Sequence, residues 1–321
     1  MAHASKVLGS AVEAIGGTPV VELSRATAGF EGRILAKLEY LNPGLSKKDR
    51  IARQIIEDAE ADGSLAPGQT VVELTSGNTG TGLAIVCAVS GHPFVAVMSA
   101  GNSPERARMM RALGAEVVLV PQAPGGRAGH ISGADLDLVD RRAAELTVER
   151  RAFRADQFRS VGNMRAHLLH TGPEFLAQAQ DGINAFCEFV GSAGTFAGCA
   201  AAFKAHDPSI RCYVVEPVGA AVLAGGEAPS PHHRIQGGGY GYRDLPLLDP
   251  THVDGFLAVT DEEAIAAAHL LARREGIFAG FSAGANLAAA FQLLKGPCRG
   301  RTVAIVLADS GLKYLSTDLW P

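Results

Sequence analysis

Short apolar runs alternate with amphipathic stretches along most of this chain. In the first half they predict strands at 70–74, 93–98 and 116–120, with helices at 79–90, 103–113 and 135–146. Ser103 followed by Pro104 favours the start of a helix, and Gly114 favours its end. Because the strands are almost continuously apolar and each leads into a helix, we expect a parallel sheet covered on both faces.

A second series of the same kind occupies the rest of the chain. It predicts strands at 185–190, 211–215 and 302–307, and helices at 196–204 and 283–294. The Gly-rich and Pro-rich segment 121–130 predicts a surface loop. A chain of 321 residues is long enough for two domains, so the sequence predicts an α/β fold built from two α/β units.

Composition and charge exclude several classes of function. Hydrophobic residues make up 47%, charged residues 19% and the net charge is -4, so nothing favours binding to nucleic acid or an anionic membrane. No apolar run reaches the roughly 18 residues of a membrane helix. The first residues lack the features of a secretory signal, so we expect a cytoplasmic protein. Five scattered cysteines predict reduced core thiols, and no His or Cys cluster has the spacing of a metal site.

Three turns rich in Gly, Ser and Thr lie where a predicted strand gives way to a helix. They are Thr75-Ser-Gly-Asn-Thr-Gly80, Gly191-Ser-Ala-Gly-Thr195 and Gly280-Phe-Ser-Ala-Gly-Ala-Asn286. A helix N-terminus presents unpaired N–H groups and the positive end of a dipole, so such turns can hold anionic groups. The first suits a carboxylate and the second a phosphate. The alternative interpretation is that Ser76 or Asn78, and likewise Ser282, only cap their helices.

A lysine upstream of these turns adds an amine nucleophile. Lys48 begins a predicted helix whose apolar residues recur at helical spacing. The positive end of the helix dipole lowers the pKa of an amine, which favours the neutral form needed for a Schiff base. Position alone does not separate Lys48 from Lys47.

The third turn also fits the letters of a hydrolase motif. Residues 280–284 match the Gly-x-Ser-x-Gly pattern of the nucleophile elbow. An α/β-hydrolase needs a histidine after the serine, and the last histidine, His269, precedes Ser282. The order of residues therefore argues against a hydrolase.

The lysine, the carboxylate turn, the phosphate turn and the serine turn, in this order, resemble the pyridoxal-phosphate enzymes of fold type II, specifically the cysteine synthase and cystathionine β-synthase family. Further matching segments are Gly16-Gly-Thr-Pro19, Lys37-Leu-Glu-Tyr-Leu-Asn-Pro43, Thr171-Gly-Pro-Glu174, His233-Arg-Ile-Gln-Gly237, Gly276-Ile-Phe-Ala-Gly280 and Asp309-Ser-Gly-Leu-Lys-Tyr-Leu-Ser-Thr317. The resemblance implies two doubly wound α/β domains with pyridoxal 5'-phosphate in the cleft between them. Residues 1–43 and 156–321 would form the larger, cofactor-binding domain, and residues 44–155 the smaller, mobile one.

The resemblance also implies a role for each candidate site residue. Lys48, rather than Lys47, holds the cofactor and acts as the catalytic base. Asn78 contacts the 3-oxygen of the cofactor, and Ser282 contacts its pyridine nitrogen. The phosphate is assigned to Gly191, Ser192, Ala193, Gly194 and Thr195. The substrate-binding set consists of Thr75, Ser76, Thr79, Gln157 and Gly237.

The implied reaction is a β-replacement on an activated serine through an aminoacrylate. O-Acetylserine, or alternatively O-phosphoserine, would react with sulfide to give L-cysteine. A neutral hydroxyl at Ser282 does not keep the ring nitrogen protonated, which favours rapid loss of the β-substituent. The alternatives are a larger nucleophile, such as homocysteine or an amine, and a catalytically silent scaffold or binding protein of the same fold. The implied protein partners are a second copy in a homodimer and a serine acetyltransferase tail at the cleft.

Several positions differ from the usual cysteine synthase pattern. The phosphate turn reads Gly-Ser-Ala-Gly-Thr where Gly-Thr-Gly-Gly-Thr is usual, which retains its hydroxyls. Tyr240 stands where cysteine synthases have a small residue, and in this respect the chain is similar to cystathionine β-synthases. Leu312 and Lys313 replace the usual Glu-Arg before Tyr314, and the loop 122–135 is longer than expected. The identity of the second substrate therefore stays open.

Overall fold

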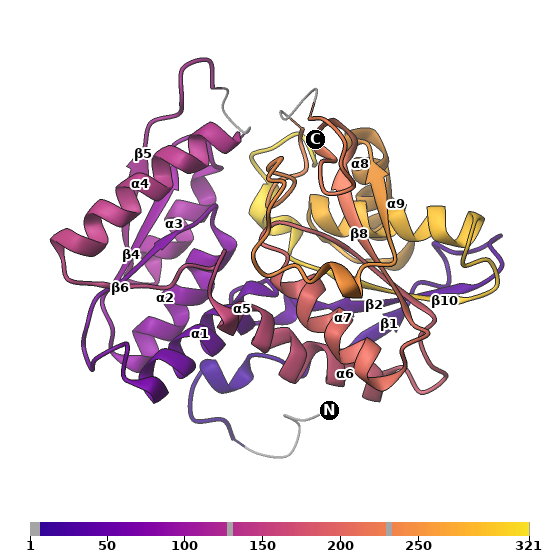
Figure 1. The fold of residues 1–321 in the computed structure, drawn as a ribbon, viewed down its shortest axis with the longest axis horizontal. Helices are drawn as coiled ribbons and strands as arrows, with labels where there is room; N and C mark the ends of the chain where they lie inside the picture. Colours follow the sequence, from indigo (N-terminus) through magenta and orange to yellow (C-terminus); the bar gives the residue numbers. More distant parts are fainter. Residues whose placement is uncertain (1–6, 127–130, 229–232, 321) are drawn as a thin grey trace.

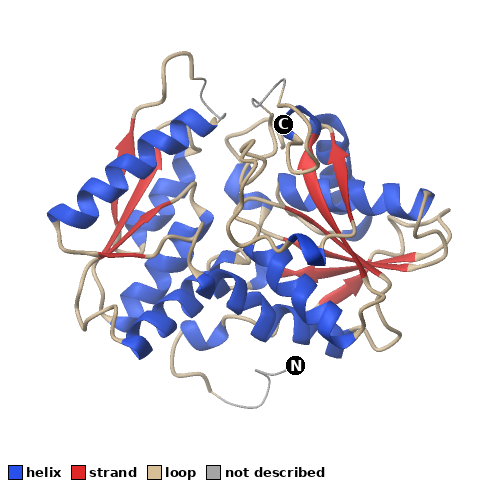
Figure 2. Cartoon of the chain, viewed as in Figure 1, coloured by secondary structure: helices blue, strands red, loops and turns tan. Residues whose placement is uncertain are grey.

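The computed structural model describes residues 7–126, 131–228 and 233–320. Its strands form two sheets, each covered by helices, and the two layered units lie side by side (Figure 1, Figure 2). Within these ranges, no helix combines the length and the apolar character needed to cross a bilayer. All five cysteines are free and buried, which confirms the expected core thiols.

The smaller sheet has four parallel strands in the order β5-β4-β3-β6. The strands are β3 (Val71–Leu74), β4 (Phe94–Ser99), β5 (Glu116–Val120) and β6 (Phe153–Arg154), and the helices are α1 (Lys48–Asp62), α2 (Asn78–Ser90), α3 (Pro104–Ala112) and α4 (Gly133–Glu149). Side chains of β3 and β4 alternate between two cores. One core contains α4, and the other contains α1, α2 and α3, so both faces are covered.

The larger sheet has six strands in the order β1-β2-β10-β7-β8-β9. The strands are β1 (Val20–Glu22), β2 (Arg33–Leu38), β7 (Ala185–Phe189), β8 (Arg211–Pro217), β9 (Gly255–Val259) and β10 (Thr302–Leu307), and the helices are α5 (Val161–Ala166), α6 (Gly172–Gln178), α7 (Gly194–His206), α8 (Asp261–Leu270) and α9 (Phe281–Lys295). Helices α8 and α9 pack on one face, and α6 and α7 pack on the other. All pairings are parallel except that of β1 with β2.

The predicted α/β fold with two doubly wound sheets is confirmed. The strands expected at 116–120 and 302–307 have the same bounds as β5 and β10, and the other predicted elements differ from the observed ones by a few residues at their ends. The antiparallel edge strand β1 was not predicted. Residues 127–130 of the expected loop lie outside the described residues, and the domain boundaries at 43/44 and 155/156 stay a prediction.

Helix α3 begins where the sequence predicts, but Ser103 does not cap it in the expected way. Ser103 occupies the N-cap of α3, as predicted, but its side chain forms no capping hydrogen bond. Its hydroxyl instead donates to the carbonyl of Lys313 at 3.4 Å, so this residue connects α3 to the C-terminal segment.

The parallel strands direct two of the three turns toward one region. The carboxylate turn follows β3 and the phosphate turn follows β7, and the segment 308–310 follows β10. The strand expected before the third turn is absent from the described residues, where Ala279 forms only an isolated bridge with Ser310. The carboxyl ends of parallel strands meet at one edge of a sheet, where loops can form a ligand site. The candidate residues of both sheets therefore lie at neighbouring edges.

Candidate active site

Lys48 is the first residue of α1 and lines a cavity between the two sheets together with the phosphate turn. The loop before it is attached to the segment after β10. The Lys47 N–H donates to the Ala308 carbonyl at 2.8 Å, and Ser46 pairs with Asp309 in an isolated bridge. This attachment places the start of α1, on the smaller unit, against the larger sheet.

The surroundings of Lys48 favour the neutral form of its amine. Burial and the adjacent charge of Lys47 lower the pKa of Lys48 to about 7, although Glu188 and Glu73 act in the opposite direction. Among the described residues, no carboxylate forms an ion pair with Lys48. A large fraction of this amine is therefore unprotonated at neutral pH, as a nucleophile or proton acceptor must be.

The phosphate turn has the geometry of an anion site. Its five residues all line the same cavity as Lys48, and the last two begin α7. Ala193 has a φ of 62°, the left-handed conformation that lets successive backbone N–H groups converge on an anion. Gly194 packs directly against the Asn163 amide, so a Cβ at this position would clash. The turn itself contains no basic residue, so it offers an anion its backbone N–H groups and hydroxyls.

The hydroxyls of the turn are oriented by two side chains that sequence reasoning missed. Asn163 Nδ2 donates to Ser192 Oγ at 2.8 Å. His167 lies 3.1 Å from Thr195 Oγ1 through Nε2, and 2.8 Å from Thr171 Oγ1 through Nδ1. Burial, with the charges of nearby cations, holds the pKa of His167 well below its usual value, so this ring is neutral. A neutral imidazole can orient the Thr195 hydroxyl without adding a charge.

Asn78, the first residue of α2, is held from both sides by the C-terminal segment. Its Oδ1 accepts a hydrogen bond from Lys313 Nζ at 2.8 Å, and its Nδ2 donates to Asp309 Oδ2 at 2.6 Å. Tyr314 donates to the same carboxylate oxygen at 2.6 Å. Because lysine only donates and a carboxylate only accepts, the orientation of the amide is determined, and one Nδ2 hydrogen remains for a ligand.

The five predicted substrate residues lie together. Thr75, Ser76, Thr79, Gln157 and Gly237 line a second cavity, which shares Lys48, Asn78, Ser192 and Gly237 with the lining of the first. Thr79 Oγ1 donates to Gln157 Oε1 at 2.5 Å, and Gln157 Nε2 donates to the Leu74 carbonyl at 2.9 Å. The structure therefore brings every predicted site residue to one place, while their individual roles stay predictions.

The capping alternatives for two of the turns are wrong. The N-cap of α2 is Gly77 and that of α9 is Gly280, and neither Ser76, Asn78 nor Ser282 occupies such a position. In the first turn the Thr75 hydroxyl accepts hydrogen bonds from the N–H groups of Gly77 and Gly80, each at 2.9 Å. Ser282, the second residue of α9, lines the cavity beside Lys48.

Arg106 binds the backbone of the carboxylate turn. This residue was not identified from the sequence. Its Nη1 donates to the Ser76 carbonyl at 2.7 Å, and its guanidinium lies over the Tyr314 ring at 4.8 Å from the centroid. The chain of contacts from Ser76 through Arg106 and Tyr314 continues to Asp309 and Asn78. It links the carboxylate turn to the candidate cofactor residue.

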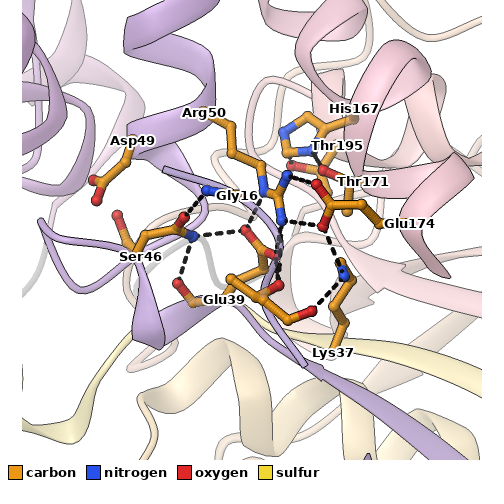
Figure 3. A network of polar contacts seen from close by, with 12 residues as sticks. Gly16, Lys37, Glu39, Ser46, Asp49, Arg50, His167, Thr171, Glu174 and Thr195 are labelled. Atoms are coloured by element: carbon orange, nitrogen blue, oxygen red, sulfur yellow. Dashed lines mark hydrogen bonds and ion pairs between the residues drawn. The ribbon is translucent and has the colours of Figure 1, made fainter. Parts of the chain in front are cut away.

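A buried ionic network fixes α1 just after Lys48 (Figure 3). Arg50 Nε and Nη2 bind the Glu39 carboxylate at 2.7 and 2.8 Å, and its Nη1 and Nη2 bind Glu174 at 2.7 and 2.8 Å. Lys37 lies 3.0 Å from Glu174. Burial alone would raise the pKa of Glu39, but the Arg50 guanidinium lowers it to about 2. Burial acts in the same way on Glu174, whose pKa Arg50 and Lys37 lower to about 2. Both carboxylates are therefore ionised and hold the helix that carries Lys48.

Comparison with known proteins identifies the family. The model of the family described as "Pyridoxal-phosphate dependent enzyme" matches residues 12–309. The chain belongs to this family. It is 41% identical over 319 residues to the cysteine synthase of Staphylococcus aureus strain Mu50, with 99% of this chain and 98% of that relative covered.

Solved enzyme structures are similar over the same length. The structure of an O-ureido-L-serine synthase is 37% identical, has a TM-score of 0.87, and covers 98% of this chain and 96% of its own. An O-acetylserine-dependent cystathionine β-synthase from Helicobacter pylori is 32% identical, has a TM-score of 0.88, and covers 98% and 100%. The protein is thus a pyridoxal-phosphate-dependent, cysteine synthase-like enzyme, and its Ser282 motif is not that of a hydrolase.

The residues present fit pyridoxal 5'-phosphate. A neutral amine, a helix N-terminus, an amide N–H and a hydroxyl line one cavity, from Lys48, Gly194, Asn78 and Ser282 respectively. These groups match, in kind, the aldehyde, phosphate, phenolic oxygen and pyridine nitrogen of the cofactor. The donor set needs no metal ion, and none of the described His, Cys, Asp and Glu residues form a group of three that could hold one.

Proposed function

We propose that this enzyme makes L-cysteine from O-acetylserine and sulfide by β-replacement. The observation that carries the proposal is the position of the partly neutral Lys48 amine, in a cavity that continues into a carboxylate-binding turn and a phosphate turn. The full-length similarity to a curated cysteine synthase supports the choice of reaction. The intact lysine and all three turns argue against a silent scaffold.

Each residue has a defined task in this proposal. The N–H groups of residues 191–195 bind the phosphate, Asn78 donates to the 3-oxygen, and the Ser282 hydroxyl meets the ring nitrogen. When bound, pyridoxal phosphate withdraws electrons, which acidifies the α-hydrogen of the amino acid and assists departure of the β-substituent. Lys48 binds the cofactor at rest. Once released, its Nζ accepts the α-proton as a neutral general base.

The carboxylate turn orients the amino acid for this proton transfer. The substrate carboxylate binds at the N-terminus of α2, among Thr75, Ser76 and Thr79, with Gln157 beside them. The dipole and N–H groups of α2 compensate its charge, and Arg106 holds the turn through the Ser76 carbonyl. Fixing the carboxylate fixes the α-carbon relative to Lys48, which is the main contribution that a positioning site makes.

The second substrate is decided on the side of the cavity that carries Tyr240. This ring packs near Phe158 and Tyr242, each 6.2 Å away between centroids, and lines the cavity with Lys48. The alternative nucleophile is homocysteine, and the similar Helicobacter pylori protein is named a cystathionine β-synthase. Tyr240 is the residue that favours this alternative, because cysteine synthases have a small residue at its position. Tyr240→Ala should therefore lower the rate with homocysteine relative to the rate with sulfide.

An absorbance titration of the holoenzyme tests the function. O-Acetylserine, O-phosphoserine and serine are added in turn, followed by sulfide or homocysteine, and the product is identified by mass spectrometry. We expect O-acetylserine to shift the visible band of the cofactor, and sulfide to restore it with formation of cysteine. Recovery with homocysteine alone would contradict the proposal, as would a shift caused only by O-phosphoserine. Lys48→Ala serves as the control that should not turn over.

We further propose a cytosolic homodimer to which a serine acetyltransferase tail docks at the cleft. The five free thiols are consistent with a reducing compartment. Sedimentation of the holoenzyme at several concentrations tests the dimer. A competition assay with a C-terminal acetyltransferase peptide tests the docking, because a peptide in the cleft should slow the absorbance change caused by O-acetylserine.

A further inference from the structure

A second lysine occupies the cofactor cavity, and no step of the proposed reaction uses it. Lys47 forms an ion pair with Glu188, the fourth residue of β7. The Lys47 side chain is 12% exposed and that of Glu188 is 1% exposed. Both residues line the cavity that also contains the phosphate turn and Ser282. This pair is therefore part of the wall that a bound cofactor would meet.

Glu188 is held in place from its other side. Asn286 Nδ2 donates to Glu188 Oε2 at 2.7 Å, and Asn286 Oδ1 accepts from the Phe189 N–H at 2.6 Å. Burial raises the pKa of Glu188, although Lys47 and Asn286 act against it. The carboxylate thus depends on Lys47 as its only lysine or arginine ion-pair partner among the described residues.

A phosphate on the neighbouring turn changes the balance of charge at this pair. Glu188 and residues 191–195 line the same cavity, so a phosphate on the turn puts a dianion in the cavity that holds this buried carboxylate. Two like charges in a site of low dielectric constant repel strongly unless a cation lies between them. The described charged residues that line this cavity are Lys47, Lys48, Glu188 and Asp309, with no arginine. In the proposed function Lys48 binds the carbonyl of the cofactor, so Lys47 is the remaining cation that could lie beside the phosphate.

We propose that Lys47 is a further phosphate-binding residue of this enzyme, whose ammonium is paired with Glu188 before the phosphate arrives and then lies between the phosphate and Glu188. The proposal rests on the proposed assignment of the phosphate to residues 191–195. Lys47 lines the same cavity as all five residues of the turn. The segment Ser46-Lys47-Lys48 therefore supplies a ligand to both ends of the cofactor.

Binding of pyridoxal phosphate and of pyridoxal, which lacks the phosphate, separates this role from others. Apoprotein of the full chain is titrated with each ligand, followed by protein fluorescence, in the wild type, Lys47→Met, Lys47→Arg and Lys295→Met. A lost charge-assisted contact corresponds to about 10- to 100-fold in the dissociation constant. We expect Lys47→Met to weaken binding of pyridoxal phosphate by this factor and to leave binding of pyridoxal within about twofold. Lys47→Arg should retain most of the affinity.

Lys295→Met removes a lysine charge at the C-terminal end of α9, whereas Ser282 lies at the N-terminal end of this helix. This variant should change neither the dissociation constant of pyridoxal phosphate nor that of pyridoxal. Glu188→Gln gives a test in the opposite direction. Removing the competing carboxylate should tighten binding of pyridoxal phosphate and strengthen competition by inorganic phosphate. If the Lys47–Glu188 pair had only a structural role, Lys47→Met and Glu188→Gln would each weaken the binding of pyridoxal phosphate and of pyridoxal by the same factor. This result would overturn the proposal. If the wild type itself bound pyridoxal as tightly as pyridoxal phosphate, the assigned phosphate site would be wrong instead.

Discussion

Replacement of Arg50 by methionine tests how much the buried ionic network after Lys48 contributes to the stability of the fold. Arg50 is 3% exposed, and its guanidinium joins Glu39, which is fully buried, to Glu174. The methionine side chain keeps the apolar stem and removes five hydrogen bonds, to Glu39, Glu174 and Thr18. The variant leaves the Glu39 carboxylate without its cation.

The magnitude follows from the partners that remain. Removing one member of a buried ion pair costs about 3 to 5 kcal/mol, because the other charge stays buried and uncompensated. Glu174 keeps Lys37 at 3.0 Å and the Gly17 N–H at 3.1 Å, so its loss is partly compensated. Glu39 keeps only neutral donors, including Thr18 Oγ1 at 2.6 Å. We therefore expect a loss of about 3 to 5 kcal/mol in the free energy of unfolding, not twice that amount.

The dependence on pH gives a second signature. In the wild type the pKa of Glu39 is lowered to about 2, from an ordinary value of 4.5. A lowered pKa stabilises the fold above the unfolded-state pKa, and this stabilisation is lost as the pH falls from about 4.5 toward 2. In Arg50→Met, burial should raise the Glu39 pKa instead, so the carboxyl group binds a proton more readily in the folded state. The difference between variant and wild type should then shrink as the pH is lowered from 7 to 5.

The assay is urea unfolding of the apoprotein at pH 7 and pH 5, so that cofactor binding does not contribute to the measured stability. Arg53→Met is the matched control. Arg53 lies one turn along the same helix and pairs with Glu57 at 2.6 Å on the surface, a kind of contact worth at most about 1 kcal/mol. If Arg50→Met cost no more than Arg53→Met, the reasoning about the network would be refuted.

Four further outcomes are expected. Lys48→Ala should abolish the absorbance band of bound cofactor while the far-ultraviolet spectrum stays unchanged, and retained turnover would contradict the assignment. The rate at which apoprotein captures pyridoxal phosphate should rise through pH 7 and then level off, because the neutral Lys48 amine reacts and its pKa is about 7; a rate independent of pH from 6 to 9 would argue against it. Lys313→Met should release the Asn78 amide and weaken cofactor binding about tenfold, whereas Lys313→Arg should retain it. Gly194→Ala should clash with Asn163 and lower both thermal stability and cofactor affinity, and a variant with normal affinity would show that the turn tolerates displacement.

The amino-acid sequence alone predicted the strands, helices and turns, which depend on local patterns of residues. Hydrophobic runs such as 116–120 predicted strands because a buried parallel strand must be apolar on both faces. The turns at 75–80 and 191–195 were visible because small and hydroxylated residues end a strand and begin a helix, and the turn at 280–286 because such residues begin a helix. Their ordered motifs were also sufficient to indicate the family, which the family model later confirmed.

The contacts that make these turns into a site were decided only by the tertiary structure. Asn78 meets Lys313 across 235 residues, Arg50 meets Glu174 across 124, and Lys47 meets Glu188 across 141. Periodicity reports which face of an element is buried, but not which element covers it. Strand order and helix packing bring such partners together, and burial then makes each pairing obligatory because an unpaired charge inside the protein is too costly. Position alone could not tell the two adjacent lysines apart, and only the family resemblance selected Lys48. Their different surroundings, an ion pair for Lys47 and a lowered pKa for Lys48, were decided by the tertiary structure.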